Sequence, residues 1–268
     1  RSGMLMKPMF EAARSTKRRL VLAEGEGGKM LQACQLIVSE QLADVTLVGR
    51  PHVIEDKIKS MGLSIVPGKD FDIVDNLNDD VITSIGEEYH GLMARQGMTP
   101  KAAQTRVRAN TTVVASMLLR RGDADVMLCG TFGTYGKHLQ MVDEIIGRKK
   151  ESPVIGALTV LILPQGTIFL TDTHVNFDPT AEQLCVLAEL AADEIRRFGI
   201  QPKAAFLSHS NFGSSSTPSA TKVREATAMF MERYPHIEAD GEMQADAALD
   251  EKVRLDLLPQ SKLTGSAN

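Results

Sequence analysis

The sequence predicts an α/β protein of two lobes, in which parallel strands are covered by helices on both faces. The chain has 268 residues, which is long for one compact core and suits two lobes of roughly 100–150 residues each. Hydrophobic residues make up 43% of the chain and charged residues 24%, so we expect most of it to fold. Short β-rich runs alternate with longer amphipathic runs, and strand–helix–strand repetition of this kind places helices on both sides of a parallel sheet.

The first half of the chain predicts four strands with helices between them. We expect the strands at residues 19–23, 45–48, 71–74 and 126–129. We expect helices at residues 27–40, 51–62 and 79–95, and a further helix that starts at Thr99-Pro100. Ligands of such sheets bind outside the carboxyl ends of the strands, which here are residues 24–28, 49–50, 75–76 and 130–137.

The pattern changes after residue 150. Two apolar runs, residues 154–163 and 167–172, flank Pro164-Gln165-Gly166 and predict a hairpin with a three-residue turn. The elements expected next are a helix at 180–198 capped by Gly199, a strand at 204–207, a helix at 219–233, an extended segment at 237–239 and a helix or turn near Asp246. We place the lobe boundary at residue 148, so that the first lobe comprises residues 1–148 and the second comprises residues 149–268.

Charge, hydropathy and cysteines exclude several classes of protein. The net charge is −4, so we expect no nucleic acid partner. The longest apolar run is shorter than the ~18–20 residues that cross a bilayer, and no signal-peptide pattern opens the chain, so we expect no membrane partner. Cys34, Cys129 and Cys185 are odd in number and widely spaced, which indicates buried free thiols in a cytoplasmic protein.

The polar segment from Leu207 to Pro218 is the most informative stretch. It begins at the carboxyl end of a predicted strand and leads into a helix, with several hydroxyl side chains and Gly213 between them. Hydroxyl groups and backbone N–H groups near a helix N-terminus can hold an anion, such as phosphate or a carboxyl thioester. The alternative is a polar loop in which Thr217 or Ser219 caps the helix.

The segment from Asp240 to Ala248 carries three carboxylates within seven residues. It could supply an acid/base pair or a hydrogen-bonding wall of a cleft. It could equally be a solvated loop followed by a helix cap. No histidine stands at ligand spacing, so we expect no metal site there.

Other segments carry weaker signals. The residues from Cys129 to Lys137 contain three glycines but match neither GxxxxGK[ST] nor GxGxxG, so we expect a loop that lines a cleft and no nucleotide site of those two classes. Residues 24–29 predict a tight strand–helix turn. The six histidines are scattered and no GxSxG motif is present, which argues against a serine hydrolase.

These segments, in this order, resemble the phosphate acetyltransferase family. The motifs that carry the resemblance are LAEGE, ASMLLRRGDADVMLCG, TIFLTDTHVNFDPTAEQLCVLAELAADEIRRFGIQPKAAFLSHSNFGSSS, TKVREAT and DGEMQADAAL. The chain is similar above all to the branch that forms the carboxyl-terminal domain of bacterial NADP-dependent malic enzymes, through LMKPMFEAAR, LVGRPHVIEDKI, DFDIVDN and LSHSNFGSS. The resemblance covers nearly the whole chain.

This resemblance implies a fold and a function. The fold would be two three-layer αβα lobes of the isocitrate-dehydrogenase-like type with a cleft between them, and we expect the C-terminal elements that return to the first lobe to be missing. Acetyl-CoA would bind as an allosteric effector. The parent polypeptide would be a multifunctional, metal-binding oxidoreductase that uses NADP and Mg or Mn in a malic enzyme domain absent from this chain. The domain would assemble into a homo-oligomer, as a dimer or higher.

Departures from the acetyltransferase pattern indicate binding without catalysis. Phe212 stands where active members carry a lysine, Met93 stands where they carry an arginine, and Gly130-Thr131-Phe132-Gly133-Thr134 replaces Gly-Ala-Asp-Ala-Thr. Each charge-assisted hydrogen bond is worth roughly 1.5–3 kcal/mol, and catalysis depends on such bonds to developing charge. Ligand binding can survive their loss.

We therefore expect a regulatory domain with no catalytic and no metal-ligating residue. The residues expected to bind acetyl-CoA or its phosphates are Ser208, Ser210, Asn211, Phe212, Gly213, Ser214, Thr131, Asp240, Gln244 and Asp246. Two alternatives remain open: an active phosphate acetyltransferase that moves acetyl between CoA and phosphate, and an assembly module that has lost its ligand.

Overall fold

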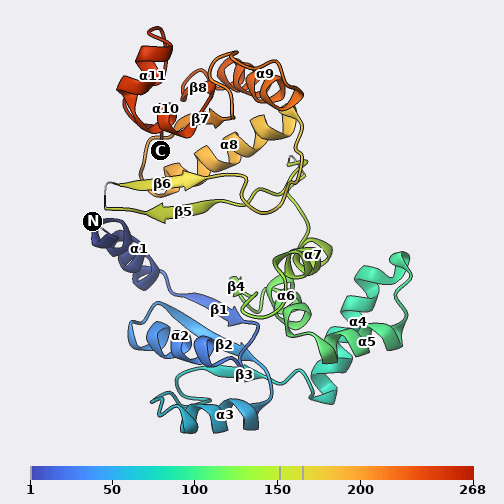
Figure 1. Cartoon of the computed structure of the whole chain (residues 1–268). Coiled ribbons are helices and arrows are strands. Elements are labelled where there is room, and N and C mark those ends of the chain that lie inside the picture. Colours follow the sequence, from blue (N-terminus) through green and yellow to red (C-terminus); the bar gives the residue numbers. More distant parts are fainter. Residues whose placement is uncertain (1, 151, 165) are drawn as a thin grey trace. The chain divides into compact units, whose positions relative to one another are not determined.

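The computed structural model describes residues 2–150, 152–164 and 166–268 (Figure 1). It confirms the predicted α/β class with parallel strands flanked by helices. The chain divides into an N-terminal unit, residues 6–147, and a C-terminal unit, residues 148–268 together with residues 1–5. That these units correspond to the lobes 1–148 and 149–268 stays a prediction.

The N-terminal unit contains the four predicted strands in one parallel sheet of order β3-β2-β1-β4. Its elements are α1 (Ser2–Ser15), β1 (Arg18–Leu22), α2 (Gly28–Ser39), β2 (Ala43–Val48), α3 (Pro51–Ser60), β3 (Asp72–Val74), α4 (Asp79–Met93), the short 3₁₀ helix η1 (Ala94–Gln96), α5 (Pro100–Ala109), α6 (Thr111–Arg121), β4 (Val126–Leu128) and α7 (Tyr135–Ile145). The chain order reverses across the sheet between β1 and β4, which makes their carboxyl ends a switch point where ligands commonly bind.

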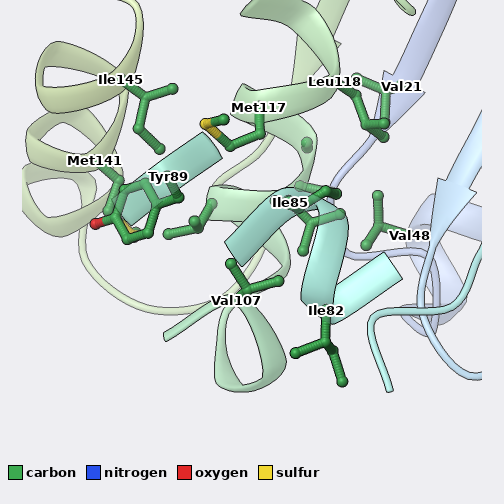
Figure 2. Close-up of a cluster of buried hydrophobic side chains, with 14 of the residues drawn as sticks. Val21, Val48, Ile82, Ile85, Tyr89, Val107, Met117, Leu118, Met141 and Ile145 are labelled. Carbon is green, nitrogen blue, oxygen red and sulfur yellow. The ribbon is translucent and has the colours of Figure 1, made fainter. Parts of the chain in front are cut away.

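Strand β1 supplies side chains to both faces of this sheet. Leu20 and Leu22 pack in the apolar cluster formed with α2 and α3. Val21, the residue between them, packs in the other cluster, which is formed with helices α4 to α7. Figure 2 shows part of that second cluster, with Val21 from β1 and Tyr89 from α4. Alternate residues of a strand point to opposite faces, so this apolar pattern requires helices on both sides.

The C-terminal unit contains two pairs of strands. Its elements are β5 (Thr159–Ile162), β6 (Thr167–Leu170), α8 (Ala181–Arg197), β7 (Lys203–Leu207), α9 (Pro218–Arg233), β8 (Glu238–Met243), α10 (Ala245–Leu249) and α11 (Glu251–Leu257). Strands β5 and β6 form the predicted antiparallel hairpin, and β7 pairs in parallel with β8. Phe206 of β7 packs with α8 and α9, whereas its neighbour Ala205 packs against the cluster of α10, so helices cover both faces of this pair.

Three local predictions for this unit were wrong. Residues 154–158 are not part of β5, because the backbone there bonds elsewhere: Ala157 donates its N–H to the Asp172 carboxylate at 3.0 Å. Of the predicted hairpin turn, Gln165 lies outside the described residues, and Gly166 exchanges two backbone hydrogen bonds with Leu163 next to the β5–β6 ladder, so it pairs across the hairpin instead of lying within its turn. Strand β8 continues past residue 239 to Met243, so two of the three carboxylates expected in a loop, Asp240 and Glu242, lie in a strand.

The last residue connects the two strand pairs. Asn268 accepts a hydrogen bond from the Phe169 N–H of β6 at 2.7 Å and donates one to the Lys203 carbonyl of β7 at 3.0 Å. An apolar groove of about 480 Å³ follows the edges of β6 and β7. The segment that leads to Asn268 is held by the buried Arg254, whose guanidinium donates to the carbonyl oxygens of Leu263 and Gly265. The same guanidinium donates to the Ala247 carbonyl in α10.

The cysteine prediction holds for two residues of three. Cys34 and Cys185 are buried free thiols, and burial raises the pKa of Cys34 to about 12. Cys129 is also a free thiol but is half-buried, because it lies at the carboxyl end of the edge strand β4. Within the described residues, no helix combines the length and the apolar character needed to cross a membrane.

Candidate functional site

The Ser/Gly segment after β7, residues 208–216, folds around a buried carboxylate from the neighbouring strand. Glu242 of β8 has no exposed side-chain surface. Its Oε1 accepts hydrogen bonds from the Ser210 hydroxyl at 2.8 Å and from the Gly213 N–H at 2.9 Å. The Glu242 carbonyl accepts a further bond from the Phe212 N–H at 2.8 Å. These three bonds, together with the bond from the Ser208 N–H to the Met243 carbonyl at 2.9 Å, tie the loop to β8.

Arg224 of α9 neutralises this carboxylate. Its Nε donates to Glu242 Oε2 at 2.9 Å, and its Nη2 donates to Oε1 at 2.9 Å. Nη2 also donates to the Ser215 carbonyl, so the guanidinium reaches back to the loop. Burial alone would raise the pKa of Glu242, but the hydrogen bonds from Arg224, Gly213 and Ser210 outweigh it and lower the pKa to about 2. Glu242 is thus charged across the physiological pH range.

This arrangement changes the interpretation of the Ser/Gly segment. Ser210 and the Gly213 N–H were expected to hold an external anion, yet both donate to the protein's own carboxylate. Ser210 is fully buried, as its role toward Glu242 requires. The residues between Leu207 and Pro218 include no lysine or arginine. The one guanidinium described at this loop, Arg224, is already paired with Glu242.

The other predicted residues of this unit lie together but mostly bond one another. Asn211 accepts from the Gln244 N–H at 2.7 Å, and the Gln244 side chain donates to the His209 carbonyl at 2.9 Å. Ser208 accepts from the Ser210 N–H at 3.2 Å. Ser214 accepts from the Asn211 N–H at 3.0 Å. The structure therefore brings the loop and the start of α10 into one polar surface.

Asp240 and Asp246 have different surroundings. Asp240 is buried and accepts from the Ser261 hydroxyl at 2.6 Å and the Lys262 N–H at 2.9 Å, so it anchors the turn that follows α11. Asp246 is exposed and accepts from the N–H of Ala247 at 2.8 Å. Neither is solvated loop, because Asp240 lies in β8 and Asp246 in α10.

Phe212 is a packing residue in this structure. Its backbone has φ of 47°, a left-handed conformation that is uncommon outside glycine. Its ring is half-buried against the apolar cluster of Met243, Ala247 and Leu263. The position where active family members are expected to carry a lysine thus presents an apolar side chain to the interior.

The hydroxyls that face outward form a second row on this loop. His209 Nε2 lies 3.3 Å from the Ser215 hydroxyl and 3.2 Å from the Thr217 hydroxyl. Thr217 is the N-cap residue of α9 but makes no capping hydrogen bond with its side chain. His209 and Ser215 were not chosen as site residues from the sequence, and Thr217 was considered there only as a helix cap.

Thr131 belongs to the N-terminal unit, whereas the other nine predicted residues belong to the C-terminal unit. Its hydroxyl donates to the buried Glu24 carboxylate at 3.3 Å, and the Gly130 N–H donates to the same carboxylate at 2.8 Å. His138 lies 3.9 Å from Glu24 and 2.9 Å from the Thr112 hydroxyl. These contacts join the ends of β1 and β4 at the switch point.

The polar turns at the carboxyl ends of this sheet meet in one cavity of about 660 Å³ within the N-terminal unit. Its lining includes Glu24, Glu26, Arg50, Asn76, Phe132 and His138. Residues from the turns after all four strands of this sheet line the cavity. Across residues 2–150, 152–164 and 166–268, no group of three or more metal-ligating side chains is arranged to hold a metal ion.

Two residues central to this surface were missed from the sequence. Glu242 was noted among the carboxylates after Ile237 but was not chosen as a site residue. Arg224 lies in the TKVREAT motif, where nothing local distinguishes it from a solvated helix charge. Their pairing joins residues 18 positions apart and becomes evident only when α9 packs against β8.

A parallel sheet between helices and a second parallel strand pair that carries a Ser/Gly loop define the general class, an α/β protein of the phosphotransacetylase fold. The crystal structure of a phosphotransacetylase from Streptococcus pyogenes matches with a TM-score of 0.87 and 25% identity, covering 99% of this chain and 80% of that one. The chain belongs to the phosphate acetyl/butaryl transferase family, whose sequence profile matches residues 4–268.

Within this family the chain is similar to two kinds of relatives. It is 49% identical over 268 residues to the NADP-dependent malic enzyme of Haemophilus influenzae, covering all of this chain and 35% of the relative. It is 30% identical over 271 residues to the phosphate acetyltransferase of Clostridium acetobutylicum, covering 98% of this chain and 80% of the relative. The chain thus spans about a third of the length of the malic enzymes that it matches.

Proposed function

We propose that this chain is a regulatory phosphate acetyltransferase-like domain that binds acetyl-CoA as an allosteric effector and mediates oligomerisation. The parent polypeptide would be a cytoplasmic malic enzyme that oxidatively decarboxylates malate to pyruvate. NADP and Mg or Mn would be bound by a malic enzyme domain outside this chain. This chain would supply binding without chemistry.

The pattern of similarity supports the malic enzyme setting. Identity to three NADP-dependent malic enzymes is 44–49% over the whole chain, whereas identity to phosphate acetyltransferases is 30–31% over 97–98% of it. A regulatory domain can change the activity of the enzyme that contains it only if the domain's ligand binds one conformational state more tightly than another. This difference in binding free energy is typically worth 1–3 kcal/mol.

The observation that carries the proposal is the internal ion pair of the Ser/Gly loop. The Arg224 guanidinium and the Ser210 hydroxyl are both engaged by Glu242, so a phosphate arriving at this loop meets a neutral assembly. Transfer between a thioester and phosphate needs donors aimed at developing negative charge. The outward groups, such as His209 and Ser215, can still bond a thioester carbonyl or an amide of the ligand.

A titration of the intact chain with acetyl-CoA tests the effector role. We expect saturable binding that is weakened several-fold by Gln244→Ala, because Gln244 is exposed on the proposed surface. Lys101→Ala, an exposed change on α5 in the other unit, is the matched control and should leave the affinity unchanged. Absence of saturable binding by the wild-type chain would overturn the effector role.

An active phosphate acetyltransferase is the second candidate. The matches to phosphate acetyltransferases over nearly the whole chain favour it. Phosphate-dependent release of CoA from acetyl-CoA separates the two candidates, since the effector role predicts binding without turnover.

A further inference from the structure

We draw no further inference here: the strongest candidate, the apolar groove of about 480 Å³ along the edges of β6 and β7 in the C-terminal unit, carries no proposal because nothing in the structure shows what covers it.

Discussion

At the scale of single residues, Glu242 decides what the Ser/Gly loop can do. A buried carboxylate is costly unless it is paired and hydrogen-bonded, and Arg224, Ser210 and Gly213 meet both needs. The same bonds use up the donors that an external phosphate would require. One side chain thus ties the loop to β8 and pairs with the Arg224 guanidinium, as the proposed binding role without catalysis requires.

Glu242→Gln tests this role in stability. The amide keeps the shape but loses the ionic hydrogen bonds, so we expect the free energy of unfolding to fall by about 2 kcal/mol. Glu232→Gln, an exposed change on α9, should alter it by less than about 0.5 kcal/mol. Urea denaturation of the three proteins measures both values, and equal stability of wild type and Glu242→Gln would contradict the account.

The pH dependence of that difference follows from the lowered pKa of Glu242. The folded pKa of about 2 lies below the ordinary value of 4.5, so the ion pair contributes its full stability above about pH 4.5. The contribution decreases as the pH falls from 4.5 toward 2, because the unfolded chain then binds the proton first. Denaturation curves at pH 7 and pH 3 should therefore show a smaller gap between wild type and Glu242→Gln at pH 3; a gap that grows on acidification would refute the assignment.

At the scale of elements, the pairing of β7 with β8 positions the loop against its carboxylate. A β-bulge at Phe206/Leu207 interrupts the register opposite Gly241. Gly241 has φ of 146°, and a Cβ there would lie 2.7 Å from the Phe206 carbonyl oxygen. The backbones of β7 and β8 approach each other too closely at this point for any side chain. This close approach explains why a glycine stands between the buried residues Asp240 and Glu242.

Gly241→Ala should therefore destabilise the protein by about 3 kcal/mol, through both steric overlap and an unfavourable φ. Gly199→Ala is the control, because Gly199 also has a positive φ of 72° but has open space around it. It should cost about 1 kcal/mol. Thermal and urea unfolding give both numbers, and a similar loss for the two variants would show that the close approach at Gly241 has little effect.

The elements that the sequence predicted well are those with local signals. Thr180 and Gln183 form a reciprocal capping box at the start of α8, and Thr99 caps α5, each readable within four residues. The extension of β8 was missed because Asp240-Gly241-Glu242 has the composition of a turn. What makes it a strand is pairing with β7 and partners such as Ser261, which lies 21 residues away from Asp240.

At the scale of the whole molecule, the proposed oligomer needs a surface that gains by being covered. Phe177 is fully exposed on a loop whose backbone is fixed by Asp172, which accepts two hydrogen bonds from Asn176 at 2.6 Å. Burying such a ring is worth about 1.5–3 kcal/mol, so a rigid exposed phenylalanine favours self-association. Leu161 and Ile162 on the hairpin β5–β6 are also exposed.

Phe177→Ser should lower the mass of the assembly, or weaken self-association at least tenfold, in sedimentation equilibrium. Leu36→Ser removes an exposed apolar side chain from α2 in the N-terminal unit and serves as the control, with no expected change. An unchanged mass for Phe177→Ser would remove this loop from the proposed interface.

The sequence allowed the fold and family to be predicted over nearly the whole chain, because strand and helix periods and motif order extend along it. The site was predicted only as a region. Hydroxyl and carboxylate residues were placed on the right segments, but whether Ser210 points to a ligand or to Glu242 depends on packing between α9 and β8. Residue type alone does not encode that choice.

The rate of phosphate-dependent CoA release, measured with the intact chain saturated by acetyl-CoA, tests the central claim most directly. The account predicts release far below the ~1–10³ per second of ordinary enzymes, because the cation at the loop is already paired with Glu242. Turnover within that range would contradict the regulatory role and identify the chain as a working transferase.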